Sequence, residues 1–235
     1  MTTKKEKSKP RKTGKAPREK KLYAVIGIGR FGFAIAEDLA KRGQDVIAID
    51  IDRQKIDAMS EFTPNAYVVK DLTADNLLEA GVAEADVAII GIGSHLDTSV
   101  LTTMTVLKLG VKRVIAKATS EEHGEILKLL GAEVVYPEHD MAIRLATRLC
   151  SPNVLEYISL SEDIDIMEIN LTDKAEGKSV LDLNVRRNFG INIIALKQSG
   201  KITVDITPDI VLGASDTITV IGKTVDIGRF EESLK

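Results

Sequence analysis

The sequence has one cysteine, no tryptophan and an aromatic content of only 4% among its 235 residues. A single cysteine forms no disulfide within the chain and no metal-binding spacing, so we expect Cys150, on an apolar helix face, to be a buried structural thiol. Scarce aromatic side chains argue against a stacking platform for sugars or single-stranded nucleic acid. No apolar run reaches the ~18 residues of a membrane-spanning helix, and the first one resembles a strand rather than a signal peptide. These absences predict a cytoplasmic protein.

Positive charge is concentrated at the N-terminus. Residues 1–21 contain ten Lys or Arg and two Glu, whereas the whole chain has 32 basic and 35 acidic residues. With almost no apolar residues, this segment is predicted to be a disordered basic tail. It is either a solvated tail or an electrostatic tether to an anionic surface such as the inner membrane leaflet. The remainder is acidic and offers no second basic patch, so nucleic acid is not an expected partner.

Strand-like and helix-like segments alternate over residues 22–150. Six short runs rich in Val, Ile and Ala are apolar on both faces, as central strands of a covered parallel sheet are: LYAVIGI, DVIAID, AYVVKD, DVAIIGI, RVIAKA and AEVVYP. Helical spacing lies between them, and Gly43, Gly81, Gly110 and Gly131 follow the helices as C-terminal glycines do. The fold class predicted here is α/β, a Rossmann-like doubly wound parallel sheet.

The rhythm changes after residue 150. Pro152 and polar neighbours mark a linker at residues 151–163. A small α+β domain is predicted over residues 164–235, with strands at IDIMEINL, INIIALKQSG, KITVDITPD and DTITVIG. A helix is predicted over KSVLDLNVRRNFG, closed by Gly190, and a second helix at the C-terminus.

A glycine motif, GIGRFG at residues 27–32, joins the first strand to the first helix. Gly27 permits a tight turn, Gly29 lets the backbone approach a phosphate, and Gly32 lets the helix pack against the strand. The helix N-terminus offers N–H groups and partial positive charge to phosphates. Asp50, ending the second strand, suits ribose hydroxyls and would repel a 2′-phosphate. The motif therefore predicts an adenosine-type ligand and disfavours NADP.

Arg30 adds a cation that a pyrophosphate turn does not need. It suits ADP or ATP, or a phosphate presented across a dimer, and the bland alternative is a surface arginine. Asp71, Thr73 and Lys117 follow later strands, so each is either a pocket residue at the same sheet edge or an ordinary loop residue. The predicted nucleotide-binding set is Gly27, Gly29, Arg30, Phe31, Gly32, Asp50, Ile51, Asp71, Thr73 and Lys117.

Catalytic machinery is hard to find in the sequence. The histidines are His95, His123 and His139, and none has a spacing that indicates a zinc site or a catalytic base with its partner. The chain is predicted not to be an enzyme but to sense a nucleotide. An NAD(H)-binding sensor or a small NAD-dependent oxidoreductase stays open as the alternative. A transcription regulator would need a helix-turn-helix, which neither the tail nor the C-terminal segment supplies.

Several stretches resemble RCK domains, and among them those of the KtrA-type regulatory subunits of Ktr potassium transporters. The resemblance runs from about residue 23 to 235 and is carried by YAVIGIGRFGFAIAEDL, LGAEVVYPEHDMAIRLA and KSVLDLNVRRNFGINIIALKQSGK. It implies homodimers that assemble into a homo-octameric gating ring beneath a KtrB-type membrane subunit, which conducts potassium. The protein would then be cytoplasmic and peripheral at the inner face of the cell membrane, through the ring or through the basic tail.

The resemblance also implies ligands. ATP would activate and ADP inactivate the ring from the N-terminal domain, with Arg30 reaching the ATP γ-phosphate across the dimer. Glu138 matches a glutamate that helps hold Mg²⁺ or Ca²⁺ at the ATP-bound dimer interface. Arg186, Ile193 and Ile194 match the region where the C-terminal domain of relatives binds cyclic di-AMP.

Overall fold

The computed structural model describes residues 20–151, 153–161 and 163–235, so nearly all of the basic tail expected at residues 1–21 lies outside the described residues. The chain divides into two compact units, the first ending at Pro137 and the second beginning at Glu138. Helix α6 (Pro137–Cys150) therefore falls almost wholly in the second unit, whereas the sequence pattern assigned it to the first.

Six parallel strands form the sheet of the first unit, in the order β3-β2-β1-β4-β5-β6. The strands are β1 (Leu22–Ile26), β2 (Asp45–Asp50), β3 (Asn65–Val68), β4 (Val87–Ile90), β5 (Val114–Lys117) and β6 (Glu133–Val135). The helical segments are α1 (Arg30–Lys41), α2 (Arg53–Met59), α3 (Ala74–Glu79), η1 (Val82–Glu84), α4 (Leu96–Lys108) and α5 (Glu121–Leu130). This confirms the predicted doubly wound, Rossmann-like fold.

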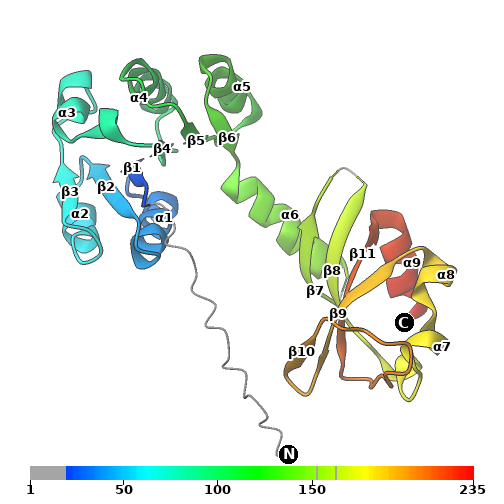
Figure 1. Ribbon diagram of the computed structural model, residues 1–235. Coiled ribbons are helices and arrows are strands. Elements are labelled where there is room, and N and C mark those ends of the chain that lie inside the picture. The colour runs from blue at the N-terminus through cyan, green and yellow to red at the C-terminus, as the bar shows by residue number, and fades with distance from the viewer. Residues whose placement is uncertain (1–19, 152, 162) are drawn as a thin grey trace, which may run out of the picture. The chain divides into compact units, whose positions relative to one another are not determined.

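Helices cover both faces of this sheet (Figure 1). Ala24 and Ile26 of β1 belong to the core beneath α3, α4 and α5, whereas Val25, between them in the sequence, belongs to the core beneath α1 and α2. Successive side chains of a strand point to opposite faces, so a strand buried on both sides must be apolar throughout. This is why the central strands have continuous apolar runs, and why the glycine turn after β1 has a rigid support.

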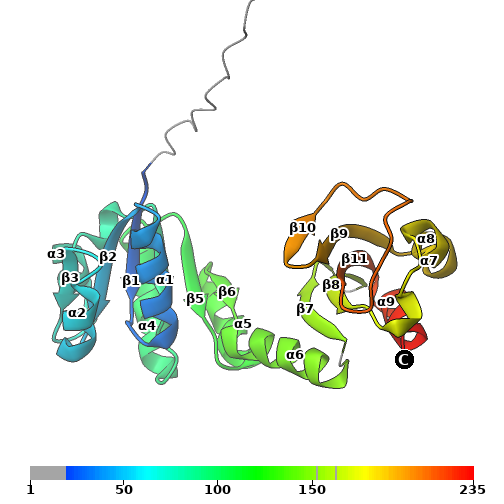
Figure 2. The same ribbon diagram turned by 90° about the horizontal axis from the view of Figure 1, so that it is seen from below.

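The second unit contains a five-stranded antiparallel sheet in the order β10-β9-β11-β8-β7. Its strands are β7 (Val154–Ser159), β8 (Ile164–Asn170), β9 (Asn192–Gln198), β10 (Lys201–Thr203) and β11 (Thr217–Lys223). Its shorter helical segments are η2 (Asp173–Ala175), α7 (Val180–Leu183), α8 (Val185–Phe189) and α9 (Thr224–Ser233). Helices α7, α8 and α9 lie together beside the sheet (Figure 2). Phe189 and Phe230 meet edge to face, with ring centroids 5.4 Å apart, and anchor α8 and α9 on the core. The α+β prediction is confirmed.

Three local predictions need correction. Residues 151–163 are not simply a linker, because β7 lies within them and pairs with β8 at the edge of the sheet. The helix predicted over residues 178–190 is two short helices, because Asn184 adopts the left-handed conformation (φ 44°), which asparagine tolerates better than most residues. The strand predicted at residues 201–209 ends at Thr203.

Helix α6 also differs from expectation. Cys150 is exposed rather than buried, and none of the residues of α6 is buried. No residue of α6 is part of an apolar core, so the apolar side chains of this helix do not place Cys150 in the interior. Among all the helices that the structure describes, none is both long and apolar enough to span a membrane.

Candidate nucleotide-binding site

The turn between β1 and α1 is closed by backbone packing against Gly27. Gly27 has a φ of +92°, which disfavours any residue with a Cβ, and its N–H donates to the Ile49 carbonyl oxygen at 2.8 Å. A Cβ at Gly32 would lie only 2.1 Å from the Gly27 carbonyl oxygen. A Cβ at Gly91, which follows β4, would lie 2.6 Å from the same oxygen. Three segments therefore meet at Gly27, and the turn depends on the absence of side chains there.

Gly29 lies at the N-terminus of α1, and the space that a side chain would take there is empty of protein atoms. A Cβ there would meet no heavy atom within 4 Å, and its φ of −78° is available to other residues. As the N-cap of α1 it supplies no side-chain hydrogen bond, and the first turn has no acidic residue. A helix N-terminus of this kind has N–H groups without intrahelical partners and a partial positive charge. The open glycine leaves that end accessible to an anion such as a phosphate.

Arg30 and Phe31 follow directly but face different surroundings. Arg30 is exposed at the first position of α1. Phe31 is half-buried and packs against the core beneath α1 and α2. Arg30 is thus placed to contact a ligand at the helix N-terminus, whereas the Phe31 side chain contributes mainly to packing.

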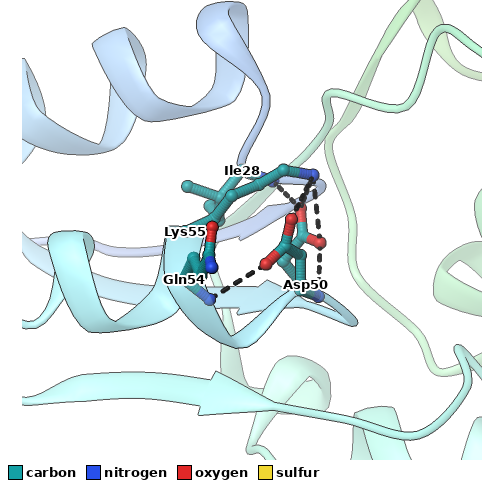
Figure 3. Close-up of polar contacts among 5 residues, drawn as sticks. Ile28, Asp50, Gln54 and Lys55 are labelled. Atoms are coloured by element: carbon teal, nitrogen blue, oxygen red, sulfur yellow. Dashed lines mark hydrogen bonds and ion pairs between the residues drawn. The ribbon is translucent and has the colours of Figure 1, made fainter.

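Asp50 is the buried charge of the site. It ends β2, is 6% exposed, and accepts hydrogen bonds from the Ile28 N–H (2.7 Å to Oδ2) and the Asp52 N–H (2.9 Å to Oδ1). The Nζ of Lys55 on α2 lies 3.4 Å from Oδ1 and 3.3 Å from Oδ2 (Figure 3). The bond from the Ile28 N–H joins Asp50 to the glycine turn. Lys55 was not predicted, although its position three residues after the N-cap Asp52 was a usable signal.

The remaining predicted nucleotide-binding residues spread along the carboxyl edge of the sheet. Ile51 is 62% exposed beside Asp50. Asp71 and Thr73 follow β3 and are exposed, and the Asp71 carboxylate accepts from Asn76 Nδ2 at 2.7 Å. Lys117 ends β5, on the far side of β4 from the glycine turn, and a Cβ at Gly93 would lie 3.1 Å from its Nζ. Asp50 is in direct hydrogen-bonded contact with the turn through the Ile28 N–H, and the roles of the other residues stay predictions.

The predicted cation residue lies in the second unit. Glu138 is exposed in the first turn of α6, next to His139 and Asp140. Among the described residues, no group of three or more His, Cys, Asp or Glu side chains is arranged to hold a metal ion. Since Mg²⁺ takes about six oxygen ligands, Glu138 fits such an ion only together with ligands from another molecule.

The three residues predicted for a second ligand differ in exposure. Arg186 is exposed on α8. Ile193 packs against the core of the second unit, whereas its neighbour Ile194 is 38% exposed. The pairing of β9 with β11 is irregular here, because Ile193 and Ala195 pair with the adjacent residues Val220 and Thr219 and leave Ile194 as an extra residue. Of the two isoleucines, Ile194 has the exposed side chain.

His123 is fully buried, and its ring is engaged by hydroxyl and backbone groups. Its Nε2 lies 3.2 Å from Ser99 Oγ, and its Nδ1 lies 3.4 Å from the Thr119 backbone nitrogen. Burial lowers the pKa of the His123 imidazole below its ordinary value of 6.5. The neutral ring therefore acts as a packing and hydrogen-bonding residue between α4 and α5. His95 is the N-cap position of α4 and His139 is exposed.

Known proteins with similar sequences cover nearly the whole chain. Residues 23–137 match the TrkA-N domain and residues 166–235 match the TrkA-C domain. The chain is 35% identical to Ktr system potassium uptake protein A of Bacillus subtilis (90% of this chain, 96% of the relative). It is 38% identical to Ktr system potassium uptake protein C of the same organism (91% and 97%). The crystal structure of the GsuK RCK domain has the same fold, with a TM-score of 0.61 at 20% identity (93% of this chain, 48% of that chain).

Proposed function

The chain contains a TrkA-N and a TrkA-C domain and belongs to the RCK family. We propose that it is the nucleotide-sensing regulatory subunit of a potassium uptake system. The observation that carries this proposal is the match to Ktr system potassium uptake proteins over more than nine-tenths of their length. Both units of the chain take part in that match, so the proposal concerns the whole protein. The membrane partner would be a potassium-conducting subunit of the KtrB type.

ATP and ADP are the ligands proposed for the first unit. The open N-terminus of α1 at Gly29 suits phosphates, and buried Asp50 beside it suits ribose hydroxyls. The two nucleotides differ by one phosphate, so a switch between them needs a group that contacts that phosphate in only one state. Arg30, exposed at the start of α1, is the proposed group, acting across a homodimer. The same turn and Asp50 also suit NAD(H), which keeps a dinucleotide sensor as the second candidate.

Assembly and the other ligands are part of the same proposal. Homodimers would form a homo-octameric ring, cytoplasmic and bound at the inner face of the membrane through its partner or the basic tail. Mg²⁺ or Ca²⁺ would bind at the dimer interface through Glu138, with further ligands from the nucleotide or a second subunit. Cyclic di-AMP is the proposed ligand of the second unit, near Arg186, Ile193 and Ile194. No catalytic step is proposed.

Calorimetric titration of the full chain with ADP, ATP and NADH, each with and without Mg²⁺, tests the nucleotide part. We expect both adenine nucleotides to bind more tightly than NADH, with a cation effect confined to ATP. Tight NADH binding with weak ATP binding would instead favour the dinucleotide sensor.

The potassium part needs a cellular test. Deleting the gene should slow growth at limiting potassium, and the wild-type chain should restore it. Arg53→Ala, on the exposed side of α2, is a control that should restore growth equally. Growth that is independent of the gene at every potassium concentration would refute the uptake function.

A further inference from the structure

Lys55 contacts the Asp50 carboxylate oxygens that would accept hydrogen bonds from the ribose hydroxyls of a nucleotide. Each oxygen of an ionised carboxylate accepts about two hydrogen bonds. One position on each Asp50 oxygen is taken by a backbone N–H, from Ile28 to Oδ2 and from Asp52 to Oδ1. The Lys55 ammonium lies within 3.3–3.4 Å of both oxygens. Few acceptor positions remain for another donor while Lys55 stays in place.

The start of α2 explains why Lys55 points at Asp50. Asp52 caps the helix by accepting from the Gln54 N–H at 2.9 Å, and its own N–H donates to Asp50. Helical side chains lean toward the helix N-terminus, so Lys55 in the first turn extends back over the Asp50 carboxylate. The ammonium also lies 3.9 Å from Asp52 Oδ2. If it leaves Asp50, an acidic partner is still within reach.

We propose that Lys55 is a specificity-determining residue of the nucleotide site: its ammonium competes with ribose hydroxyls for Asp50 and is displaced when a ribonucleotide binds. This inference rests on the proposed nucleotide function. Lys55 is 43% exposed, so displacement moves the ammonium into solvent and toward Asp52 rather than into the core. Lys55 therefore weakens the binding of ligands that use Asp50 and leaves ligands without ribose hydroxyls unaffected.

Titration of wild type and Lys55→Met with ADP and its 2′,3′-dideoxy analogue compares a ligand that uses Asp50 with one that lacks the ribose hydroxyls. Methionine keeps the length of the side chain and removes the charge. We expect Lys55→Met to bind ADP about two- to fivefold more tightly, the scale of a partly exposed ion pair. Binding of the dideoxy analogue should not change. Lys55→Arg should weaken ADP binding instead, because a guanidinium holds a carboxylate through two parallel hydrogen bonds.

Arg53→Met is the matched control for charge. Arg53 lies on the same helix, is 81% exposed and pairs with Asp57 at 3.8 Å, away from Asp50. Arg53→Met removes the same charge as Lys55→Met, so any general loss of attraction for anionic nucleotides appears in both variants. An unchanged ratio of ADP to dideoxy affinity in Lys55→Met, or weaker ADP binding, overturns the inference alone. Failure of the wild type to bind ADP or ATP overturns the proposed nucleotide site as well.

Discussion

Replacing Gly32 with alanine should unfold the nucleotide turn, and replacing Gly29 should not. The Cβ of Gly32→Ala would lie 2.1 Å from the Gly27 carbonyl oxygen and 3.2 Å from the Gly27 carbonyl carbon. Both are backbone atoms of a turn that is packed against Gly91, so they cannot move aside as a flexible side chain does. Overpacking typically costs about 1–3 kcal/mol and occasionally more, and a contact this short with backbone atoms belongs at or above the upper end of that range. Alanine returns about 1 kcal/mol of helix propensity within α1.

The net expectation for Gly32→Ala is a loss of at least about 2 kcal/mol, or about 4–8 °C in Tm for a chain of this size. Nucleotide affinity should fall with it, because the turn must open to admit the methyl group. Gly29→Ala is the matched variant, since its Cβ meets nothing within 4 Å and its φ is ordinary. It should keep the wild-type Tm and lose nucleotide affinity, because the methyl group fills the space where a phosphate approaches.

Thermal denaturation of the three proteins, followed by ADP titration at a temperature where all are folded, measures both effects. Equal melting temperatures for wild type and Gly32→Ala would refute the packing argument. Wild-type ADP affinity in Gly29→Ala would refute the placement of phosphate at the N-terminus of α1.

Three further predictions follow from single side chains. Arg30→Ala should keep ADP affinity and lose the additional response to ATP, which paired calorimetric titrations measure; equal loss of both nucleotides would contradict a γ-phosphate role. Glu138→Gln should weaken the effect of Mg²⁺ or Ca²⁺ on ATP binding, and an unchanged cation titration would remove Glu138 from the site. Because burial lowers the pKa of His123, the unfolded chain binds more protons, and stability should fall as pH drops below about 6.5. Urea denaturation at several pH values should show a shallower pH dependence of stability for His123→Gln than for the wild type.

The predictions that succeeded concern local properties of the chain. Apolar residues throughout β1 and β4 required burial on both faces, and this is possible in a parallel sheet covered by helices. The tight turn at Gly27 and the position of an acidic residue at the end of β2 could also be predicted from the residues next to them in the sequence. Position along the chain was enough for these, because each depends on backbone conformation or on side-chain alternation within one element.

The predictions that failed depend on neighbours distant in sequence. Strand β7 has only Val154 buried, so little in its composition distinguished it from a linker until β8 supplied its hydrogen-bonding partner. Cys150 was expected inside because α6 has apolar residues, yet no residue of that helix is buried. Burial is a property of what packs against an element, and apolar composition alone does not supply it.

The sequence by itself determined the two folds, the glycine turn and the position of an acidic residue at the end of β2, because these follow from periodicity and from the backbone freedom of glycine. Only the tertiary structure decided that Gly91 shares the Gly27 carbonyl oxygen with Gly32, and that Lys55 lies on the carboxylate of Asp50. The glycine contacts join segments far apart in the sequence, so packing across the sheet sets their distances. The spacing from Asp52 to Lys55 was a local signal, but the approach of the ammonium to both Asp50 oxygens depends on how α2 packs beside the end of β2.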